Sequence, residues 1–400
     1  MAERLAFVIP WYGRDLGGGA EAECRATALT LARRGVPVEI LTTCARDHGS
    51  DWTDYHPEGV TQEEGLTVRR FKVRPRGAAR FNLLNTRLLM GWPLSPLEEE
   101  EFIRESIHSD NLYAFLDAER DHYWYCFIPY LFGTTLEGTL VAPERSLLIP
   151  CLHDEPYAYL RRTRRVLERV RGVLFHTRAE LALAGRLAQT DGGAFHLVGE
   201  GVDTEIAGVG ERFRRRYGIH EPFLVYLGRK AKEKNVPLLV EYFATYRFSH
   251  PGDPLRLLLI GGGQVKIAPA LIGPVVDLGY LPQQDTYDVC AAAVALCQPS
   301  LRESFSLVLM EAWLCGTPVL VHADCAVTRE HCLESSGGLY FGDYFEFAEA
   351  VELLLSDPLL RRRLAANGRR YVLARYHWDV ITANFLKVFE ALGARLGDSR

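Results

Sequence analysis

Two glutamates eight positions apart, Glu303 and Glu311, stand out in the segment RESFSLVLMEAW, residues 302–313. Apolar residues would surround Glu311 on nearly every face of the helix that this segment predicts. A helix that is apolar on all faces is a buried helix. A buried carboxylate without a partner is costly, or it changes its protonation state. Glu311 therefore needs a partner, and a bound ligand is one way to supply it.

Cations follow a strand in the second half of the chain. The predicted strand 223–228 (FLVYLG) runs directly into Arg229, Lys230, Lys232 and Lys234. A fixed pair of cations at the carboxyl end of a strand can hold a phosphate or a pyrophosphate. A solvated basic loop is the simpler alternative.

Glycines mark two further loops. Gly262 lies in the triplet that ends the predicted strand 255–260, where a glycine allows a tight turn or a close approach of the backbone to a ligand. Gly18 and Gly19 open an amphipathic helix at 20–34, whose first amides favour an anion. The strand before them ends near Pro10, too far away for the usual dinucleotide turn. We therefore expect a loop that faces a phosphate or another substrate group.

His153, Asp154 and Glu155 end the predicted strand 145–152, at the position where catalytic groups of parallel sheets tend to lie. A metal site is the alternative, but no second histidine lies at ligand spacing. The chain also contains no D-x-D pair of the kind that often holds Mg²⁺ on a diphosphate. The sequence thus predicts no metal in the site and assigns charge neutralisation to cationic side chains and helix dipoles.

The 400 residues are too many for one ordinary core, and strands alternate with helices in both halves. We expect an α/β protein of two doubly wound, Rossmann-like domains facing across a cleft. The domains would span residues 1–200 and 201–375, and a helix at 376–400 would pack back on the first domain. The predicted strands are 4–10, 36–43, 66–73, 121–128, 145–152, 172–176 and 194–198 in the first half, and 223–228, 255–260, 275–280, 294–298 and 317–321 in the second.

Composition excludes several classes of protein. The net charge of −5 gives no case for nucleic-acid binding. No apolar run reaches the length of a membrane span, and the N-terminal residues favour a first strand over a signal peptide. Nine cysteines without a C-x-x-C pair suit reduced core thiols in a cytoplasmic protein.

Taken together, these segments resemble the retaining glycosyltransferases of family four, which have the two-domain B-type fold. LGRKAKEKN is similar to the strand–Arg–Lys element of that family, and RESFSLVLMEAWLCGTPVL to its Glu, seven residues, Glu motif followed by a C-G-T-P turn. GVDTE resembles the entry into the second domain, and residues 370–392 resemble the closing helices. The stretches after the C-G-T-P turn and around His153 are similar to enzymes that build bacterial surface polysaccharides.

The resemblance implies a role for each candidate residue. Glu311 would accept hydrogen bonds from the ribose hydroxyls of a nucleotide-diphosphate sugar, and Glu303 would contact the hydroxyls of the donor sugar. Arg229 and Lys234 would bind the diphosphate leaving group, and His153 would line the sugar pocket. The remaining donor-binding residues would be Gly18, Gly19, Gly262, Ser304, Phe305, Ser306 and Leu307. Ser304 and Ser306 stand where glycines are frequent in the family.

The implied reaction is front-face transfer of a sugar with retention and without a cofactor, to a glycan or lipid-linked glycan acceptor. A nucleotide-sugar epimerase of the same fold is the first alternative. An NAD-dependent dehydrogenase would need an acidic residue at the end of the second strand, whereas Glu39 lies in its middle. A solute-binding protein is the alternative that is not an enzyme.

Two segments of the first domain suggest contact with the inner face of a membrane. Residues 161–171 (RRTRRVLERVR) contain six arginines, and residues 79–94 combine arginines with large apolar side chains. Basic residues are attracted to anionic lipid, and neighbouring apolar residues can insert at the interface. A solvated basic face and an ordinary core segment are the alternatives.

Overall fold

The computed structural model describes residues 3–14, 16–189 and 194–396, and the chain divides into two compact units. Unit 1 consists of Met1–Gly201 and Trp378–Arg400, and unit 2 of Val202–His377. The predicted limits were 200/201 and 375/376, and residues 397–400 of the predicted last helix lie outside the described residues. Each unit has its own sheet and its own apolar core.

The sheet of unit 1 has the strand order β3-β4-β2-β1-β5-β6-β7-β8. All neighbouring strands are parallel except β3 and β4. The central strands β1 and β5 are buried over nearly their whole length, as expected for a parallel sheet covered on both faces. The strands are β1 (Arg4–Val8), β2 (Val38–Thr43), β3 (Gly59–Glu63), β4 (Leu66–Phe71), β5 (Tyr123–Phe127), β6 (Ser146–Leu148), β7 (Gly172–Phe175) and β8 (Phe195–Leu197).

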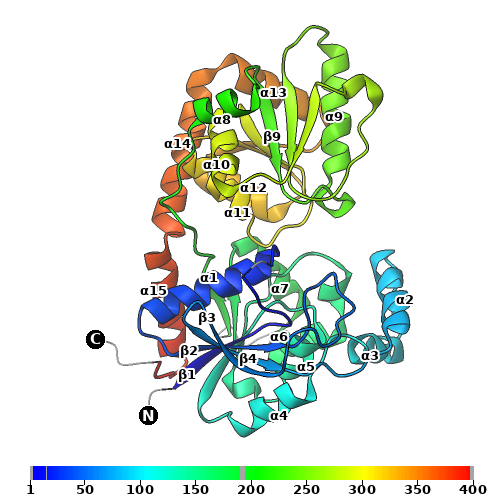
Figure 1. Ribbon diagram of the computed structural model, residues 1–400, viewed down its shortest axis with the longest axis vertical. Helices are drawn as coiled ribbons and strands as arrows, with labels where there is room; N and C mark the ends of the chain where they lie inside the picture. The colour runs from blue at the N-terminus through cyan, green and yellow to red at the C-terminus, as the bar shows by residue number, and fades with distance from the viewer. Residues whose placement is uncertain (1–2, 15, 190–193, 397–400) are drawn as a thin grey trace. The chain divides into compact units, whose positions relative to one another are not determined.

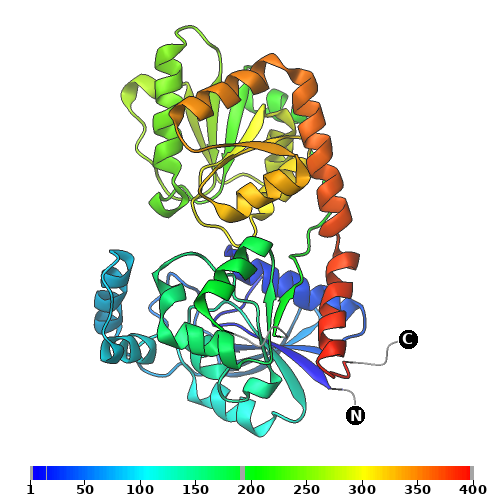
Figure 2. The same ribbon diagram turned by 180° about the vertical axis from the view of Figure 1, so that it is seen from behind.

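Helices cover both faces of this sheet (Figures 1 and 2). They are α1 (Gly19–Arg33), α2 (Ala78–Leu89), α3 (Pro96–Arg104), α4 (Asp110–Ala118), α5 (Gly133–Gly138), α6 (Arg161–Arg169), α7 (Arg178–Leu187) and α15 (Trp378–Ala391), with short 3-10 helices η1 (Pro143–Arg145) and η2 (Pro156–Tyr159).

The last helix, α15, belongs to unit 1 although it follows unit 2 in the sequence. It contacts α1, and the Asn384 side-chain amide donates to the Val198 carbonyl over 3.0 Å. A Cβ atom on Gly201 would lie 2.3 Å from the Trp378 ring, so only glycine fits at 201. These contacts fix the chain where it leaves unit 1 and where it returns.

Unit 2 is a doubly wound domain with the strand order β11-β10-β9-β12-β13-β14, and every neighbouring pair is parallel. Its strands are β9 (Phe223–Leu227), β10 (Arg256–Ile260), β11 (Val275–Gly279), β12 (Ala295–Gln298), β13 (Val319–His322) and β14 (Gly338–Phe341). Its helices are α8 (Gly210–Tyr217), α9 (Val236–Ser249), α10 (Gln283–Ala292), α11 (Leu307–Leu314), α12 (Ala326–Ser335), α13 (Tyr344–Ser356) and α14 (Pro358–Arg375), with η3 (Lys232–Lys234) and η4 (Pro269–Leu271).

The chain order reverses at β9, the first strand of unit 2. The next strand, β10, pairs on one side of β9, and the later strand β12 pairs on the other. In open parallel sheets, ligands bind beyond the carboxyl ends of the strands at such a reversal. The loops that follow β9, β10 and β12 are therefore the expected site of unit 2.

Candidate functional site

The loops after β9 and β12 meet through a salt bridge between two predicted site residues. Lys234 Nζ lies 2.8 Å from Glu303 Oε1, and the Asn235 side-chain amide donates to the Pro299 carbonyl over 3.1 Å. Asn235 has a φ of 57°, which turns the chain from η3 into α9. The structure thus brings together Lys234 and Glu303, which are 69 residues apart.

The four cations after β9 have different surroundings. The Arg229 side chain is exposed and pairs with Glu233 over 2.7 Å. Lys230 is buried, and its ammonium group contacts Asp277 Oδ1 at 2.7 Å and the Gly261 carbonyl at 2.5 Å. Lys230 therefore fixes the loop and is not available for a phosphate. Arg229, Lys232 and Lys234 remain toward solvent or at the surface of the site.

The glycines after β10 have a packing role. A Cβ atom on Gly261 would lie 2.2 Å from the Gly228 carbonyl oxygen, and Gly261 has a φ of 120°. A Cβ atom on Gly262, the predicted donor-binding glycine, would lie 2.3 Å from the Tyr280 hydroxyl. Close packing against the neighbouring backbone thus accounts for Gly261, whereas Gly262 meets only the exposed side chain of Tyr280, which can move aside.

Glu311 lies half-buried in α11, and its carboxyl forms no hydrogen bond or salt bridge with any described residue. Burial, together with the nearby charge of Asp203, raises the pKa of this carboxyl to about 7. No described residue donates a hydrogen bond to this carboxyl. Its oxygens can therefore still accept hydrogen bonds from a ligand.

The segment before α11 has an unusual backbone. Ser306 has a φ of 77°, in the left-handed region that favours glycine, and its buried hydroxyl has no hydrogen-bond partner. It is the residue before the helix, but its side chain makes no capping bond. Ser304 does not have a positive φ. Of the two serines that stand where the resembled family often has glycine, only Ser306 therefore adopts a glycine-like backbone conformation.

The side chain of Phe305, a predicted donor-binding residue, is buried in unit 2. Its ring packs edge-on against His331 and Tyr376. His331 Nε2–H donates to the Phe305 carbonyl over 3.1 Å, and burial lowers the pKa of His331 to about 3. The neutral imidazole thus anchors the loop that carries Glu303. No local pattern in the sequence marks His331, because its partner lies 26 residues away.

Packing against α14 fixes the position of α11 (Figure 2). Trp313 is fully buried and donates its Nε1–H to the Gly337 carbonyl over 2.8 Å. A Cβ atom on Gly368 of α14 would lie 2.2 Å from the Trp313 ring, so the two helices approach closely at this glycine. The register of α11, and hence the direction of Glu311, depends on this contact.

His153 lies in unit 1 in the loop after β6, where it is half-buried. Its Nδ1 lies 3.7 Å from Glu155 Oε1, and the same oxygen accepts from the Tyr130 hydroxyl over 2.9 Å. Asp154 accepts instead from the Tyr159 hydroxyl, at 2.7 Å. Of the three polar residues predicted here, the structure therefore groups His153 and Glu155.

The first turn of α1 contains an acidic residue, Glu21. Glu21 accepts from Trp11 Nε1, and a Cβ atom on Gly18 would collide with the Glu21 carboxylate. A Cβ atom on Gly19 would meet no atom within 4 Å. Gly18 thus meets only the end of the flexible Glu21 side chain, and the space around Gly19 is open.

A hollow of about 570 Å³ in unit 1 lies next to this loop and was not predicted. Arg14 and Arg46 are its exposed cations, and Arg70 is buried against Glu63 at 2.6 Å. The Tyr12 hydroxyl is buried without a hydrogen-bond partner. Tyr12 and Arg14 follow β1, Arg46 follows β2, Glu63 ends β3 and Arg70 lies in β4. The order of the strands in the sheet brings these segments together. The other lining residues are Gly13, Leu16, Asp47, Tyr55, His56, Pro57 and Thr61.

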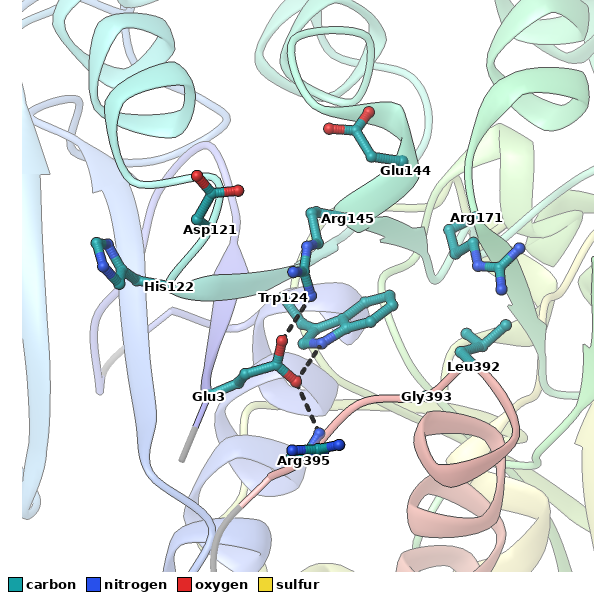
Figure 3. A pocket seen from close by; sticks show the side chains of 10 residues that line it. All are labelled: Glu3, Asp121, His122, Trp124, Glu144, Arg145, Arg171, Leu392, Gly393 and Arg395. Carbon is teal, nitrogen blue, oxygen red and sulfur yellow. Dashed lines mark hydrogen bonds and ion pairs between the residues drawn. The ribbon is translucent and has the colours of Figure 1, made fainter. Parts of the chain in front are cut away.

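A second hollow, of about 620 Å³, lies at the opposite edge of the same sheet, where the strands begin (Figure 3). Glu3 there accepts from Trp124 Nε1 at 3.1 Å and from the Arg395 backbone at 2.7 Å, and it pairs with Arg145 at 2.6 Å. These contacts join the two ends of the chain within unit 1, and no predicted site residue lines this hollow.

The arginine-rich and apolar segments also lie in unit 1. Several large side chains of α2, of the segment that follows it and of the start of α3 are exposed: Leu83, Leu89, Met90, Trp92 and Leu97. In Figures 1 and 2, α2 lies at the periphery of unit 1, beside α3. In α6, Arg161 pairs with Glu99 and Arg162 with Glu137. No described helix is both long and apolar enough to cross a membrane.

Comparison with known proteins shows similarity to glycosyltransferases. Residues 210–371 match the family described as glycosyl transferases group 1. D-inositol 3-phosphate glycosyltransferases are similar to the whole chain. That of Stackebrandtia nassauensis is 27% identical over 92% of this chain and 85% of its own length, and that of Nocardia farcinica is 26% identical over 96% and 88%.

Solved structures share the fold. A sucrose-phosphate synthase from Thermosynechococcus elongatus aligns with a TM-score of 0.73 at 19% identity, covering 98% of this chain and all of its own. HepE from Anabaena in complex with UDP aligns with a TM-score of 0.70 at 14% identity, covering 97% of this chain and all of its own.

Proposed function

Because residues 210–371 of unit 2 match the glycosyl transferases group 1 family and curated glycosyltransferases resemble most of the chain, we propose that this chain transfers a sugar from a nucleotide-diphosphate donor with retention of the anomeric configuration. The observation that carries the proposal is the arrangement at the carboxyl ends of β9 and β12. There the Lys234–Glu303 pair lies in the same unit as Glu311, a half-buried carboxyl without a protein partner.

In this proposal Glu311 accepts hydrogen bonds from the ribose hydroxyls, and Glu303 accepts from hydroxyls of the donor sugar. Arg229 and Lys234 bind the diphosphate, so their charges oppose the negative charge that grows as it leaves. The backbone of Ser304, Phe305, Ser306 and Leu307 contacts the donor, as do Gly19 and His153 of unit 1. Gly18 and Gly262 would also face the donor, since only the ends of flexible side chains crowd them.

The reaction follows a front-face course. The acceptor hydroxyl oxygen bonds to the anomeric carbon on the face from which the diphosphate leaves, and the bond from that carbon to the diphosphate oxygen breaks. A diphosphate oxygen takes the proton of the acceptor hydroxyl. Arg229 and Lys234 supply the positive charge that a divalent metal supplies in other transferases, so we propose that donor cleavage is metal-independent.

Substitution of the two cations tests their role. Arg229→Ala and Lys234→Ala should each lower kcat by about 10²-fold or more, because the lost stabilisation is largest as the leaving group departs. Arg362→Ala removes an exposed cation of helix α14, outside the loops that follow β9, β10 and β12, and should leave kcat unchanged. Desalted enzyme should gain less than about twofold in kcat on addition of Mg²⁺ or Mn²⁺. Strict dependence on either ion would refute the metal-independent part of the proposal.

For the acceptor we propose a glycan or a lipid-linked glycan used in surface polysaccharide assembly, bound by unit 1. Peripheral association with the cytoplasmic face of the inner membrane would bring the enzyme to such an acceptor. The exposed apolar side chains at Leu83, Leu89, Met90 and Trp92 support this proposal, since apolar side chains can insert at a lipid interface.

Sedimentation with vesicles tests the membrane contact. The wild type should sediment with vesicles of anionic lipid at low salt, and less so at high salt. A variant with Leu89, Met90 and Trp92 replaced by Ser should lose this binding, as should Arg161/Arg162/Arg164/Arg165→Glu. Phe248→Ser, which removes an exposed aromatic side chain of unit 2, is the matched control. A wild type that stays in the supernatant would point to a soluble acceptor.

A soluble phosphorylated polyol is the second candidate acceptor. The D-inositol 3-phosphate glycosyltransferases that resemble the whole chain favour it, and Arg14 and Arg46 give the hollow beside α1 two exposed cations. Transfer to inositol phosphate that falls strongly in Arg14→Ala and Arg46→Ala would select this acceptor. Transfer to a lipid-linked glycan alone would exclude it.

A further inference from the structure

Three buried side chains of unit 1 that the proposed reaction does not use meet in one cluster. Glu23 lies in α1, Cys151 follows β6 and His176 follows β7. One carboxylate oxygen, the thiol sulfur and one ring nitrogen all lie within 4.8 Å of one another. Their exposed fractions are 5%, 9% and 3%, so water does not solvate them freely.

The contacts within the cluster define its orientation. His176 Nε2 is in close contact with Glu23 Oε1, and Cys151 Sγ lies 3.5 Å from Glu23 Oε2. The other ring nitrogen of His176, Nδ1, lies 3.8 Å from Glu180 Oε2. Glu180 is itself fixed by the backbone N–H groups of Leu152, at 2.6 Å, and of His176, at 2.8 Å.

The cluster is rich in acidic side chains. Glu23, Glu180 and Glu200 bring three buried carboxyls toward one imidazole. Glu200 is 7% exposed, and it forms no hydrogen bond or salt bridge with any residue that the structure describes. A buried carboxyl in this state calls for a cation.

We propose that Glu23, Cys151 and His176 bind a divalent cation of the Zn²⁺ type. Thiolate, imidazole and carboxylate are the ligands that Zn²⁺ takes in proteins. Ligand atoms around a tetrahedral Zn²⁺ lie about 3.3–3.8 Å apart, so small side-chain movements would close the site. Binding displaces the Cys151 thiol proton and the proton on His176 Nε2, both of which pass to solvent. Glu180 then faces the remaining ring nitrogen, as a carboxylate that orients a metal-bound histidine does.

The site would have a structural role. The ion would join α1 to the Cys151 loop, two residues before His153, and to the strand end at His176. It is independent of the donor residues, all of which but Gly18, Gly19 and His153 lie in unit 2, and it does not rest on the proposed function.

Metal content and spectroscopy of the full-length chain test the site. Protein produced in minimal medium with Zn²⁺ should retain about one zinc ion per chain through gel filtration in EDTA, measured by elemental mass spectrometry. Protein produced with Co²⁺ should show thiolate-to-cobalt charge-transfer absorption, which reports a Cys ligand without any assay of activity. Cys151→Ser should lose this absorption, and His176→Gln should lose most of the bound metal.

Cys297→Ser is the matched control, because Cys297 is an equally buried thiol in unit 2. It should keep both the metal and the absorption. Thermal shift by nucleotide diphosphates, which reports unit 2, shows separately whether each variant is folded and whether the donor site is intact. A wild type that holds no more zinc or cobalt than Cys151→Ser, or that lacks the charge-transfer absorption, overturns the proposal. Should Cys151→Ser fail to fold, the wild-type spectrum and His176→Gln decide alone.

Discussion

Glu311 is the side chain whose environment is hardest to explain without a ligand. Its neighbours in α11 are almost all apolar, and its carboxyl has a pKa of about 7 because of burial and the charge of Asp203. The sequence predicted this conflict from the apolar run alone. The sequence could not show that the partner is missing, because a buried carboxylate often finds a partner far away in the chain, as Glu303 does in Lys234.

Replacing Glu311 by glutamine should have opposite effects on binding and on stability. Donor affinity at pH 8 should fall by about 10- to 100-fold, because a charge-assisted hydrogen bond is lost. The unliganded protein should become more stable at pH 8 by about 1–2 kcal/mol, because the raised pKa means that ionised Glu311 disfavours the folded state above its unfolded pKa. Below about pH 4.5 the carboxyl is protonated in both states, and the gain should vanish.

The pH dependence of donor binding follows from the same pKa. At pH 6 only about one-tenth of the Glu311 carboxyls are ionised, so wild-type affinity should be up to about tenfold lower than at pH 8. Calorimetry on Glu311→Gln should show a flat profile, and Glu349→Gln, an exposed acid of unit 2, should behave as the wild type. Equal wild-type affinities at the two pH values would remove Glu311 from the donor site.

Among the elements, the start of α11 shows why Ser306 departs from the glycine that is common in the resembled family. Its φ of 77° is the conformation that glycine adopts without strain, and its hydroxyl is buried without a partner. The helix predicted within residues 302–313 is observed at Leu307–Leu314, because the left-handed Ser306 ends the helical geometry on its N-terminal side.

Ser306→Gly should therefore stabilise the protein, by about 0.5–1.5 kcal/mol in denaturant unfolding, because it relieves the left-handed strain and removes an unpaired hydroxyl. Ser304→Gly is the matched control. It should destabilise by about 0.5–1 kcal/mol, since its backbone has no positive φ and glycine only adds freedom to the unfolded chain. A loss of stability in Ser306→Gly equal to that in Ser304→Gly would show that the hydroxyl has a partner in solution.

Elements with a clear apolar pattern were predicted well, and those without one were missed. Each of the twelve predicted strands corresponds to an observed strand within a few residues. The edge strands β3 and β14 were missed. β3 is almost wholly exposed and β14 is only partly buried, so neither has the continuous apolar run of a central strand. Helices α2, α3 and α4 were missed, although α2 buries Phe81, Leu84 and Leu88 at helical spacing.

At the scale of the whole molecule, the resemblance predicted a glycosyltransferase of two domains. The match of residues 210–371 to the group 1 family agrees with the predicted class, and the fold shared with solved structures agrees with the predicted fold. Contacts between residues that are distant in the chain could not be predicted from the sequence. The anchoring of Phe305 by His331, the inward turn of Lys230 and the hollow around Tyr12 and Arg70 all join segments that are distant in the chain.

The stereochemistry of transfer tests the central claim most directly. The nucleotide sugar that stabilises the protein most in a thermal-shift screen would serve as the donor, and glycan, lipid-linked and inositol phosphate acceptors would be offered in turn. Proton NMR would follow the anomeric signal. The account predicts that an α-linked donor gives an α-linked product and one nucleoside diphosphate for each sugar transferred. A β-linked product would contradict retention, and free epimerised sugar with nucleotide but no acceptor consumed would identify an epimerase.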